Sequence, residues 1–187
     1  MKEKIVYRFT LQEFKEIINK IKKENIDYFA FGGFAFDGFY GEESEHEDLD
    51  LIFFEKDKMK VVKLFKELGF KTYLHGRKHD YRNNNKKIDI LFMQDKGDYY
   101  EILGNIKRDK ISKGALVKKN NVKIEGFEFT IMPFEWFSLY LNSHHIESKR
   151  EKLNKFVNKI LPLCQKLPTL IQENVNKPDN MDKIEIK

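Results

Sequence analysis

The sequence predicts an α/β (α+β) domain in which a small mixed sheet is flanked by helices and followed by a smaller helical C-terminal part. Two observations support this prediction. Segments with apolar residues at helical spacing alternate with short apolar segments typical of buried strands, and glycines fall where these segments end. After residue 97 the character of the chain changes, and beyond a hairpin the pattern becomes mostly helical.

Each predicted element has its own local signal. Thr10 and Glu13 have the spacing of a capping box, so the first helix starts there and runs to about Glu24. Gly41 and Gly69 follow two later apolar segments and are typical helix ends. The predicted elements of this half are a helix to Glu24, a strand at 27–31, a helix at 34–40, a strand at 48–54, a helix at 58–68, and strands at 70–74 and 87–93.

The residue pattern of the second half of the chain predicts a hairpin followed by helices. Segments 122–125 and 127–131 flank Gly126, and Pro133 suits the first position of a helix at 134–141. Segment 146–174 is mostly helical in pattern, and the residues from 176 onward are polar. We therefore divide the chain into a first domain at 1–105, a hairpin and helical region at 106–175, and a frayed tail at 176–187.

Composition indicates a globular protein. The 187 residues include 17 Phe and 8 Tyr, which suffice for a core of one domain. Cys164 is the only cysteine, so an internal disulfide is excluded. No uncharged stretch approaches the roughly 18–20 residues that cross a bilayer, and the start lacks a secretion signal. We expect a soluble cytoplasmic protein without a membrane partner.

Charge is unevenly distributed. The net charge of +5 would attract phosphate groups of nucleotides or nucleic acid, or it is simply a lysine-rich solvated surface. Segment 41–50 is strongly acidic within this basic chain. Such a local excess of carboxylates indicates either a specific requirement or a tolerated repulsion.

Three aspartates are candidates for a metal site. Asp48 and Asp50 alternate with leucines on a predicted strand, so both point to one face while Leu49 enters the core. Paired carboxylates on an apolar strand repel each other, and a divalent cation such as magnesium resolves the conflict. Asp89 lies in a second apolar strand. If the two strands are neighbours, three carboxylates converge as an in-line phosphoryl displacement requires.

Other interpretations stay open at these positions. Asp48 and Asp50 could be surface acids on a half-exposed strand, with Asp89 paired to a lysine. Gly32 and Gly33 follow a strand and open a helix, where backbone N–H groups approach phosphates, although a Gly-Gly pair is often only a turn.

At these residues the chain resembles a known family. Gly32-Gly33-Phe34 with Asp37, then His46 with Asp48 and Asp50, then Asp89, resemble the pattern of the antibiotic nucleotidyltransferases. These are the lincosamide and aminoglycoside 2″ adenylyltransferases of the DNA polymerase β-like superfamily. The segments 124–136 and 145–148 resemble further stretches of the two groups, so that the resemblance covers roughly residues 10 to 160.

The resemblance implies a nucleotidyltransferase fold in the first domain and a reaction. A nucleoside monophosphate, AMP from ATP, would be transferred to a hydroxyl of a small molecule such as an aminoglycoside- or lincosamide-type antibiotic, as in antibiotic resistance. Asp48 and Asp50 would bind Mg²⁺, and Asp89 would complete the metal site or deprotonate the acceptor. Two alternatives remain: a nucleotidyltransferase acting on tRNA or protein, as in toxin–antitoxin systems, and a catalytically silent binding protein.

The chain departs from the family at two points. Phe34 stands where the family has tryptophan, and the family's basic residue before the motif histidine is missing. Gly32 and Gly33, with Lys149 or Arg150, are therefore the candidates for binding the triphosphate. Four glutamates near the metal strand favour a cationic acceptor over nucleic acid, or are simply solvated; they are Glu42, Glu43, Glu45 and Glu47.

Structural roles are expected for several other residues. Asp37 is expected to be a structural hydrogen-bonding partner rather than a catalyst. A structural role is favoured for His46, which could instead order the metal loop. Trp136 is expected to pack in the core, with a role in substrate contact left open. Cys164 is expected in the core, and the adjacent His144 and His145 do not share a helix face, so they do not form a metal pair.

Overall fold

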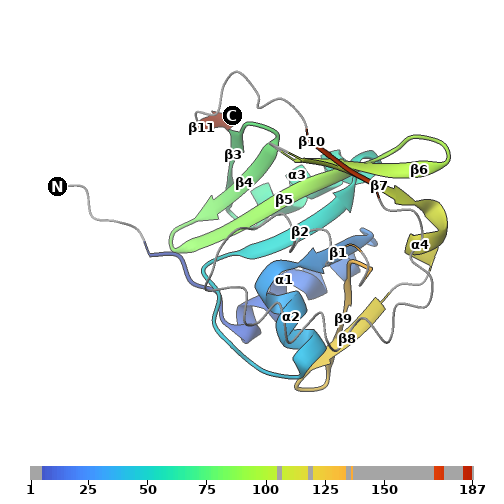
Figure 1. The fold of residues 1–187 in the computed structure, drawn as a ribbon. Helices are drawn as coiled ribbons and strands as arrows, with labels where there is room; N and C mark the ends of the chain where they lie inside the picture. Colours follow the sequence, from blue (N-terminus) through green and yellow to red (C-terminus); the bar gives the residue numbers. More distant parts are fainter. Residues whose placement is uncertain are drawn as a thin grey trace.

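The computed structural model describes residues 6–104, 107–117, 120–133, 136, 171–174 and 183–186, and its strands join one mixed sheet with helices beside it (Figure 1). The helices are α1 (Leu11–Lys23), α2 (Gly32–Tyr40), the 3-10 turn η1 (Glu55–Asp57), α3 (Lys58–Glu67) and α4 (Lys113–Val117). The strands are β1 (Tyr28–Phe31), β2 (Leu49–Phe54), β3 (Lys71–His75), β4 (Lys78–Asn83), β5 (Lys86–Asp95), β6 (Tyr99–Leu103), β7 (Lys107–Ser112), β8 (Asn120–Ile124), β9 (Phe127–Ile131), β10 (Ile171–Asn174) and β11 (Lys183–Ile186).

Strand β5 organises the sheet. It pairs with β2 in parallel along one side, which the crossover through α3, β3 and β4 makes possible. Along its other side, the first half of β5 pairs with β4 and the last residues pair with β6. Beyond β2 the order continues through β1 and β9 to β8, and β7 joins β6 to β10.

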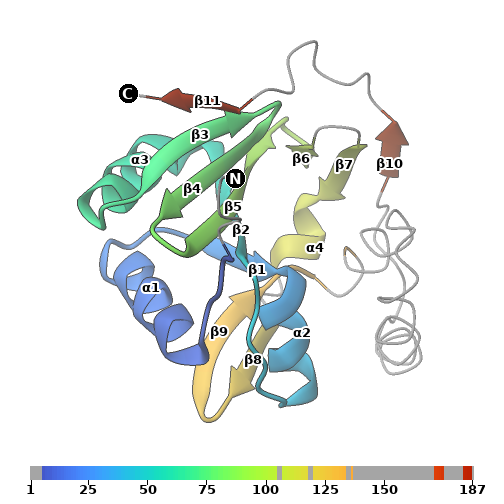
Figure 2. The ribbon, with the colours of Figure 1, turned by 90° about the vertical axis from the view of Figure 1, so that its left-hand side faces the viewer.

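The helices cover different parts of this sheet. Helix α2 contacts β1, β2 and β8, and α3 contacts β3 (Figures 1 and 2). The capping box that begins α1 forms as predicted, because Thr10 Oγ1 accepts from the Glu13 N–H while the Glu13 carboxylate accepts from the Thr10 N–H. The Phe14 ring of α1 stacks on Phe34 of α2 at 4.4 Å between ring centroids, joining the two helices in the core.

The predicted fold class is confirmed. The hairpin that turns at Gly126 also forms, as β8 and β9. Two short strands differ from the sequence prediction: residues 171–174 form β10 rather than helix, and residues 183–186 of the predicted frayed tail form β11 on β3. Each of these strands pairs with an edge strand that is distant in sequence. Local composition therefore does not predict either strand. The predicted division at residue 105 remains a prediction, and the sheet continues across it from β6 to β7.

Within the described ranges, no helix has the length and apolar character needed to cross a membrane. The predicted helices at 134–141 and 146–170 lie outside the described residues, apart from Trp136, which is helical.

Candidate active site

Three carboxylates converge where β2 and β5 run side by side. Asp50 and Asp89 are register partners on these parallel strands, so their side chains leave the sheet on one face. Asp48 precedes Asp50 by two residues and shares that face. One carboxylate oxygen from each of the three lies within 4.8 Å of the others. The structure thus brings together the three aspartates that the sequence singles out.

The cluster carries an electrostatic conflict. Burial, together with the negative charges of Asp48 and Asp89, raises the pKa of Asp50 to about 8. Three carboxylates this close repel one another, and a cation bound between them relieves this repulsion. Hard oxygen ligands suit Mg²⁺, so the donor set fits a divalent cation held by Asp48, Asp50 and Asp89.

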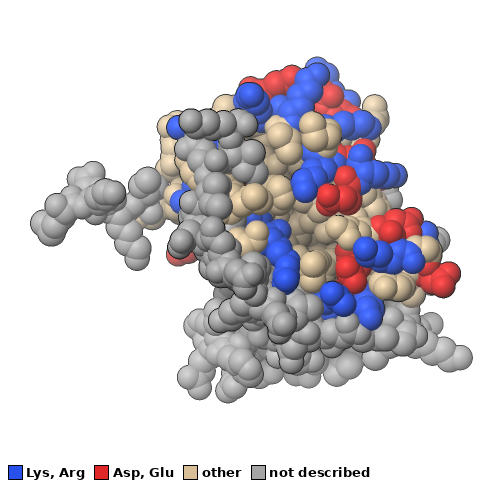
Figure 3. Space-filling model, turned by 90° about the horizontal axis from the view of Figure 1, so that it is seen from above, with Lys and Arg blue, Asp and Glu red and all other residues tan. Residues whose placement is uncertain are grey.

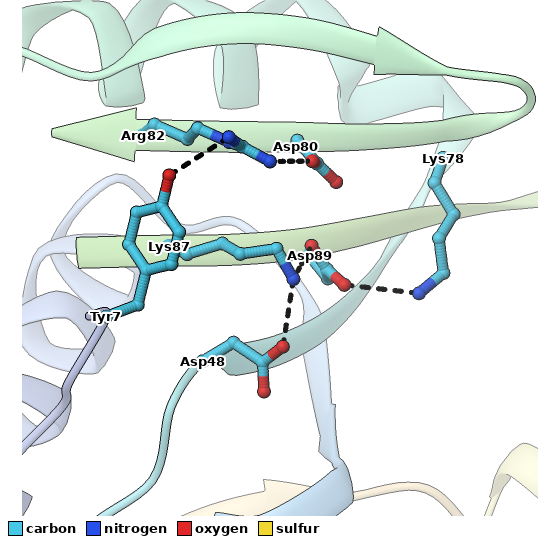
Figure 4. A network of polar contacts seen from close by, with 7 residues as sticks. All are labelled: Tyr7, Asp48, Lys78, Asp80, Arg82, Lys87 and Asp89. Atoms are coloured by element: carbon cyan, nitrogen blue, oxygen red, sulfur yellow. Dashed lines mark hydrogen bonds and ion pairs between the residues drawn. The ribbon is translucent and has the colours of Figure 1, made fainter. Parts of the chain in front are cut away.

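Two lysines lie against these carboxylates (Figure 4). Lys87 Nζ is 2.9 Å from Asp48 Oδ2 and 2.9 Å from Asp89 Oδ1. Lys78 Nζ donates to Asp89 Oδ2 at 3.2 Å. Although burial acts in the opposite direction, Lys78 and Lys87 hold the pKa of Asp89 below its usual range. The pairing of Asp89 with a lysine, considered above as an alternative to the metal site, is therefore present within the cluster itself.

A fourth carboxylate, which sequence reasoning missed, extends the row. Asp80 on β4 is the register partner of Asp89 and is 2% exposed. Arg82 Nη2 donates to Asp80 Oδ2 at 2.8 Å, and Arg82 Nη1 donates to the Tyr7 hydroxyl at 2.9 Å (Figure 4). Burial and contact with Asp89 raise the pKa of Asp80 to about 6. The sequence does contain a signal for Asp80: Lys78, Asp80 and Arg82 are each separated by one residue, so in a strand they lie on one face.

The glycine pair lies directly on the cluster. Gly32 has φ +66°, and a Cβ there would overlap Asp50 Oδ2. A Cβ on Gly33 would overlap the His46 ring. Gly32 is the first residue of α2, so the amino end of this helix faces the carboxylates, and anions bind favourably at such helix ends.

Asp37, Ser44 and His46 form a hydrogen-bonded network. Asp37 Oδ2 accepts from the Ser44 N–H at 2.8 Å and from the Ser44 hydroxyl at 2.7 Å. It lies 2.8 Å from His46 Nε2. Although burial acts in the opposite direction, hydrogen bonds from His46 and Ser44 lower the pKa of Asp37. This network holds the loop before β2 against α2, and Asp48 lies at the end of that loop.

The acidic run does not lie as one group beside the cluster. Glu45 forms an ion pair with Arg8, a partner that the sequence did not reveal. Glu43 lies within the electrostatic influence of Glu125, in the turn between β8 and β9. That turn lies near the carboxyl end of α2, whereas Gly32 at the amino end contacts Asp50 (Figure 1). Only Glu47 directly adjoins Asp48 in the chain.

Trp136 is a core residue. Its side chain is 1% exposed, its Nε1 donates to Asp109 Oδ2 at 2.9 Å, and its ring meets Phe31 edge-on at 5.4 Å. These contacts support the packing role. The remaining candidates of the sequence lie outside the described residues; they are His144, His145, Lys149, Arg150 and Cys164.

Comparisons with known proteins find a matching family and structures with a similar fold. A sequence profile of the aminoglycoside-2''-adenylyltransferase family matches residues 13–132. The lincosamide antibiotic adenylyltransferase LnuA, solved with lincomycin bound, superposes with a TM-score of 0.65 at 15% identity, covering 80% of this chain and 97% of that one. ANT(2'')-Ia, solved in complex with adenylyl-2''-tobramycin, superposes with a TM-score of 0.63 at 15% identity, covering 80% and 88%. No curated protein matches the chain significantly.

The structural likenesses establish a shared fold, and the profile match covers most of the sheet, both glycines and all three clustered aspartates. The chain belongs to the aminoglycoside-2''-adenylyltransferase family, and therefore to the nucleotidyltransferases.

Proposed function

We propose that the protein transfers AMP from ATP to a hydroxyl group of a small cationic acceptor of the aminoglycoside or lincosamide type, with release of pyrophosphate. The observation that carries the proposal is the convergence of Asp48, Asp50 and Asp89 at the amino end of α2, in a chain of this family. Such a site positions a metal-bound polyphosphate for in-line displacement.

The aspartates would divide the work. Asp48 and Asp50 would hold Mg²⁺, which when bound neutralises charge developing on the phosphates. Asp89 would complete the metal site or take the proton of the acceptor hydroxyl. The lowered pKa of Asp89 supports the first role, because a carboxylate held ionised by two lysines is a weak base.

The remaining parts of the site would bind the nucleotide. Backbone N–H groups at Gly32 and Gly33 would approach the polyphosphate, since a helix amino end attracts anions and neither glycine carries a side chain. Lys149 and Arg150 are proposed to add positive charge to this binding.

A cationic acceptor is favoured by Glu47, which is exposed and directly precedes Asp48. The named ligands of the two superposed enzymes, lincomycin and adenylyl-2''-tobramycin, belong to the same classes of acceptor. On the face shown in Figure 3, the described basic side chains lie among acidic ones rather than forming a continuous basic surface of the kind that binds nucleic acid.

Mass spectrometry would test the proposal directly. The protein is incubated with Mg²⁺ and each nucleoside triphosphate, together with an aminoglycoside, a lincosamide, tRNA or no added acceptor. We expect ATP to add one AMP to a hydroxyl of one antibiotic class, and the D48N/D50N double variant to add none. AMP on tRNA or on the protein itself would contradict the choice of acceptor, and binding without any transfer would contradict the enzyme assignment.

A further inference from the structure

Lys87 has an unusual place in the carboxylate cluster. It precedes Asp89 by two residues on β5, so both side chains leave the same face of the sheet. Its ammonium nitrogen is 2.9 Å from an oxygen of Asp48 and 2.9 Å from an oxygen of Asp89 (Figure 4). Its side chain is only 19% exposed. Lys87 therefore bridges two of the three residues that could bind a metal ion.

The ammonium and a divalent cation compete for these carboxylates. Both need the oxygens of Asp48 and Asp89, and a single positive charge beside a double one is strongly repelled at such distances. A lysine carries its positive charge at neutral pH, so this competing charge is present when a metal ion arrives. A cation that binds Asp48 and Asp89 must therefore move the ammonium away.

The displaced ammonium needs another anion. A charged group that is mostly buried and has no partner destabilises the protein by an amount on the order of several kcal/mol. Lys78 already pairs with the other oxygen of Asp89, and Arg82 already pairs with Asp80, the next carboxylate of the row. The anion that would arrive with the metal is the polyphosphate of the nucleotide.

We propose that Lys87 is an internal counter-ion that occupies the carboxylate cluster until metal and nucleotide arrive together, and that its ammonium then pairs with the polyphosphate. The inference rests on the proposed function for the identity of that anion. It predicts weak binding of a divalent cation alone and cooperative binding of cation and nucleotide.

Titration of Mn²⁺ into the nucleotide-free protein, followed by calorimetry and by the paramagnetic resonance signal of free Mn²⁺, tests the first part. We expect K87M to bind Mn²⁺ at least about 10-fold more tightly than wild type, because the competing charge is gone. K87R keeps a cation in place and should stay near wild type. K86M is the matched control, since the neighbouring Lys86 pairs with Glu13 outside the cluster and its loss should leave Mn²⁺ binding unchanged. Equal Mn²⁺ affinity in K87M and wild type, including no binding to either, overturns the proposal.

The preformed Mg²⁺ complex of a non-hydrolysable ATP analogue tests the second part. K87M should bind this complex no more tightly than wild type, because removing the competitor also removes the partner of the polyphosphate. A gain about as large as that for Mn²⁺ alone would overturn the transfer of Lys87 to the polyphosphate.

Thermal unfolding in EDTA and in Mn²⁺ guards against a folding defect. K87M should unfold at a lower temperature than wild type in EDTA, because its carboxylates lack a cation until the metal binds. Its unfolding temperature should also rise more than that of wild type when Mn²⁺ is added. If K87M is unfolded in EDTA, we expect it to refold when Mn²⁺ is added. Failure to refold would contradict the proposal. None of these measurements uses an acceptor, so they stand apart from the test of AMP transfer.

Discussion

The α-carbon of Gly32 lies directly against the carboxylate of Asp50, with no room between them for a methyl group. This contact joins the amino end of α2 to the centre of the carboxylate cluster. It also makes residue 32 a glycine for two separate reasons, its positive φ and the absence of space for a side chain.

The first prediction follows from that contact. G32A should lower the free energy of unfolding by at least about 2 kcal/mol more than G41A does. Gly41 is the matched control, because its φ of +73° carries similar strain but a Cβ there meets nothing within 4 Å. Urea unfolding measures the difference, and the turnover of G32A should fall as well. Equal losses in the two variants would mean that Asp50 moves aside without cost.

Asp50→Asn should separate catalysis from stability. We expect turnover to fall at least about 100-fold, because metal-held charge stabilisation is worth several kcal/mol. Stability without metal should not fall, since Asp50 already resists ionisation beside Asp48 and Asp89. Steady-state kinetics and thermal unfolding in EDTA measure both. A folded variant with wild-type turnover would remove Asp50 from the metal site.

Asp89→Asn decides between two roles of this residue. If Asp89 is a general base, turnover should be abolished while the affinity for Mg-ATP stays near wild type. If Asp89 binds the metal, the affinity should fall too, which the lowered pKa of Asp89 leads us to expect. Calorimetry with Mg²⁺ and a non-hydrolysable ATP analogue separates these outcomes. Normal activity in the variant would exclude both.

Asp37→Asn should destabilise the fold in a pH-dependent way. The pKa of Asp37 is lowered in the folded protein, so its stabilising contribution is complete above the unfolded value and is lost as the pH falls through the folded value. We expect a loss of about 1–2 kcal/mol at neutral pH. The difference from wild type should shrink below about pH 4. Urea unfolding at several pH values measures it, and a difference that grows in acid would contradict the network.

Glu47→Gln should weaken the binding of a cationic acceptor. We expect the acceptor KM to rise a few-fold, with a smaller effect at high salt because exposed charges are screened. E42Q/E43Q is the matched control, since Glu43 lies near Glu125, away from the carboxylates. Steady-state kinetics with the labelled acceptor measure both. If E47Q behaves like the control, the acidic run has no part in acceptor binding.

Local patterns predicted much of this structure. The capping box at Thr10 and the glycine end of α2 are signals within a few neighbouring residues, and both occur as expected. The alternation of Asp48 and Asp50 with leucines predicted that the two aspartates share the face of β2 opposite the core. The pattern could also have shown Lys87 on the face of Asp89, because the two are separated by one residue.

Other features depend on pairing between distant segments. Asp80 joins the cluster only because β4 pairs with β5 in one register, which no local pattern fixes. Strands β6 and β7 were missed because charged residues interrupt the apolar run of β6 and make up most of β7. Two of these residues, Glu101 and Asp109, are buried and find partners from other segments in Arg108 and Trp136.

The pairing of β11 with β3 also bears on how the protein behaves in a concentrated solution. Without β11, the outer N–H and C=O groups of β3 would be open to any other extended chain, including another copy of the protein. Residues 183–186 cover this edge of the sheet. We expect a chain shortened before Lys183 to associate edge to edge more readily than the full chain, even with every aspartate of the cluster in place.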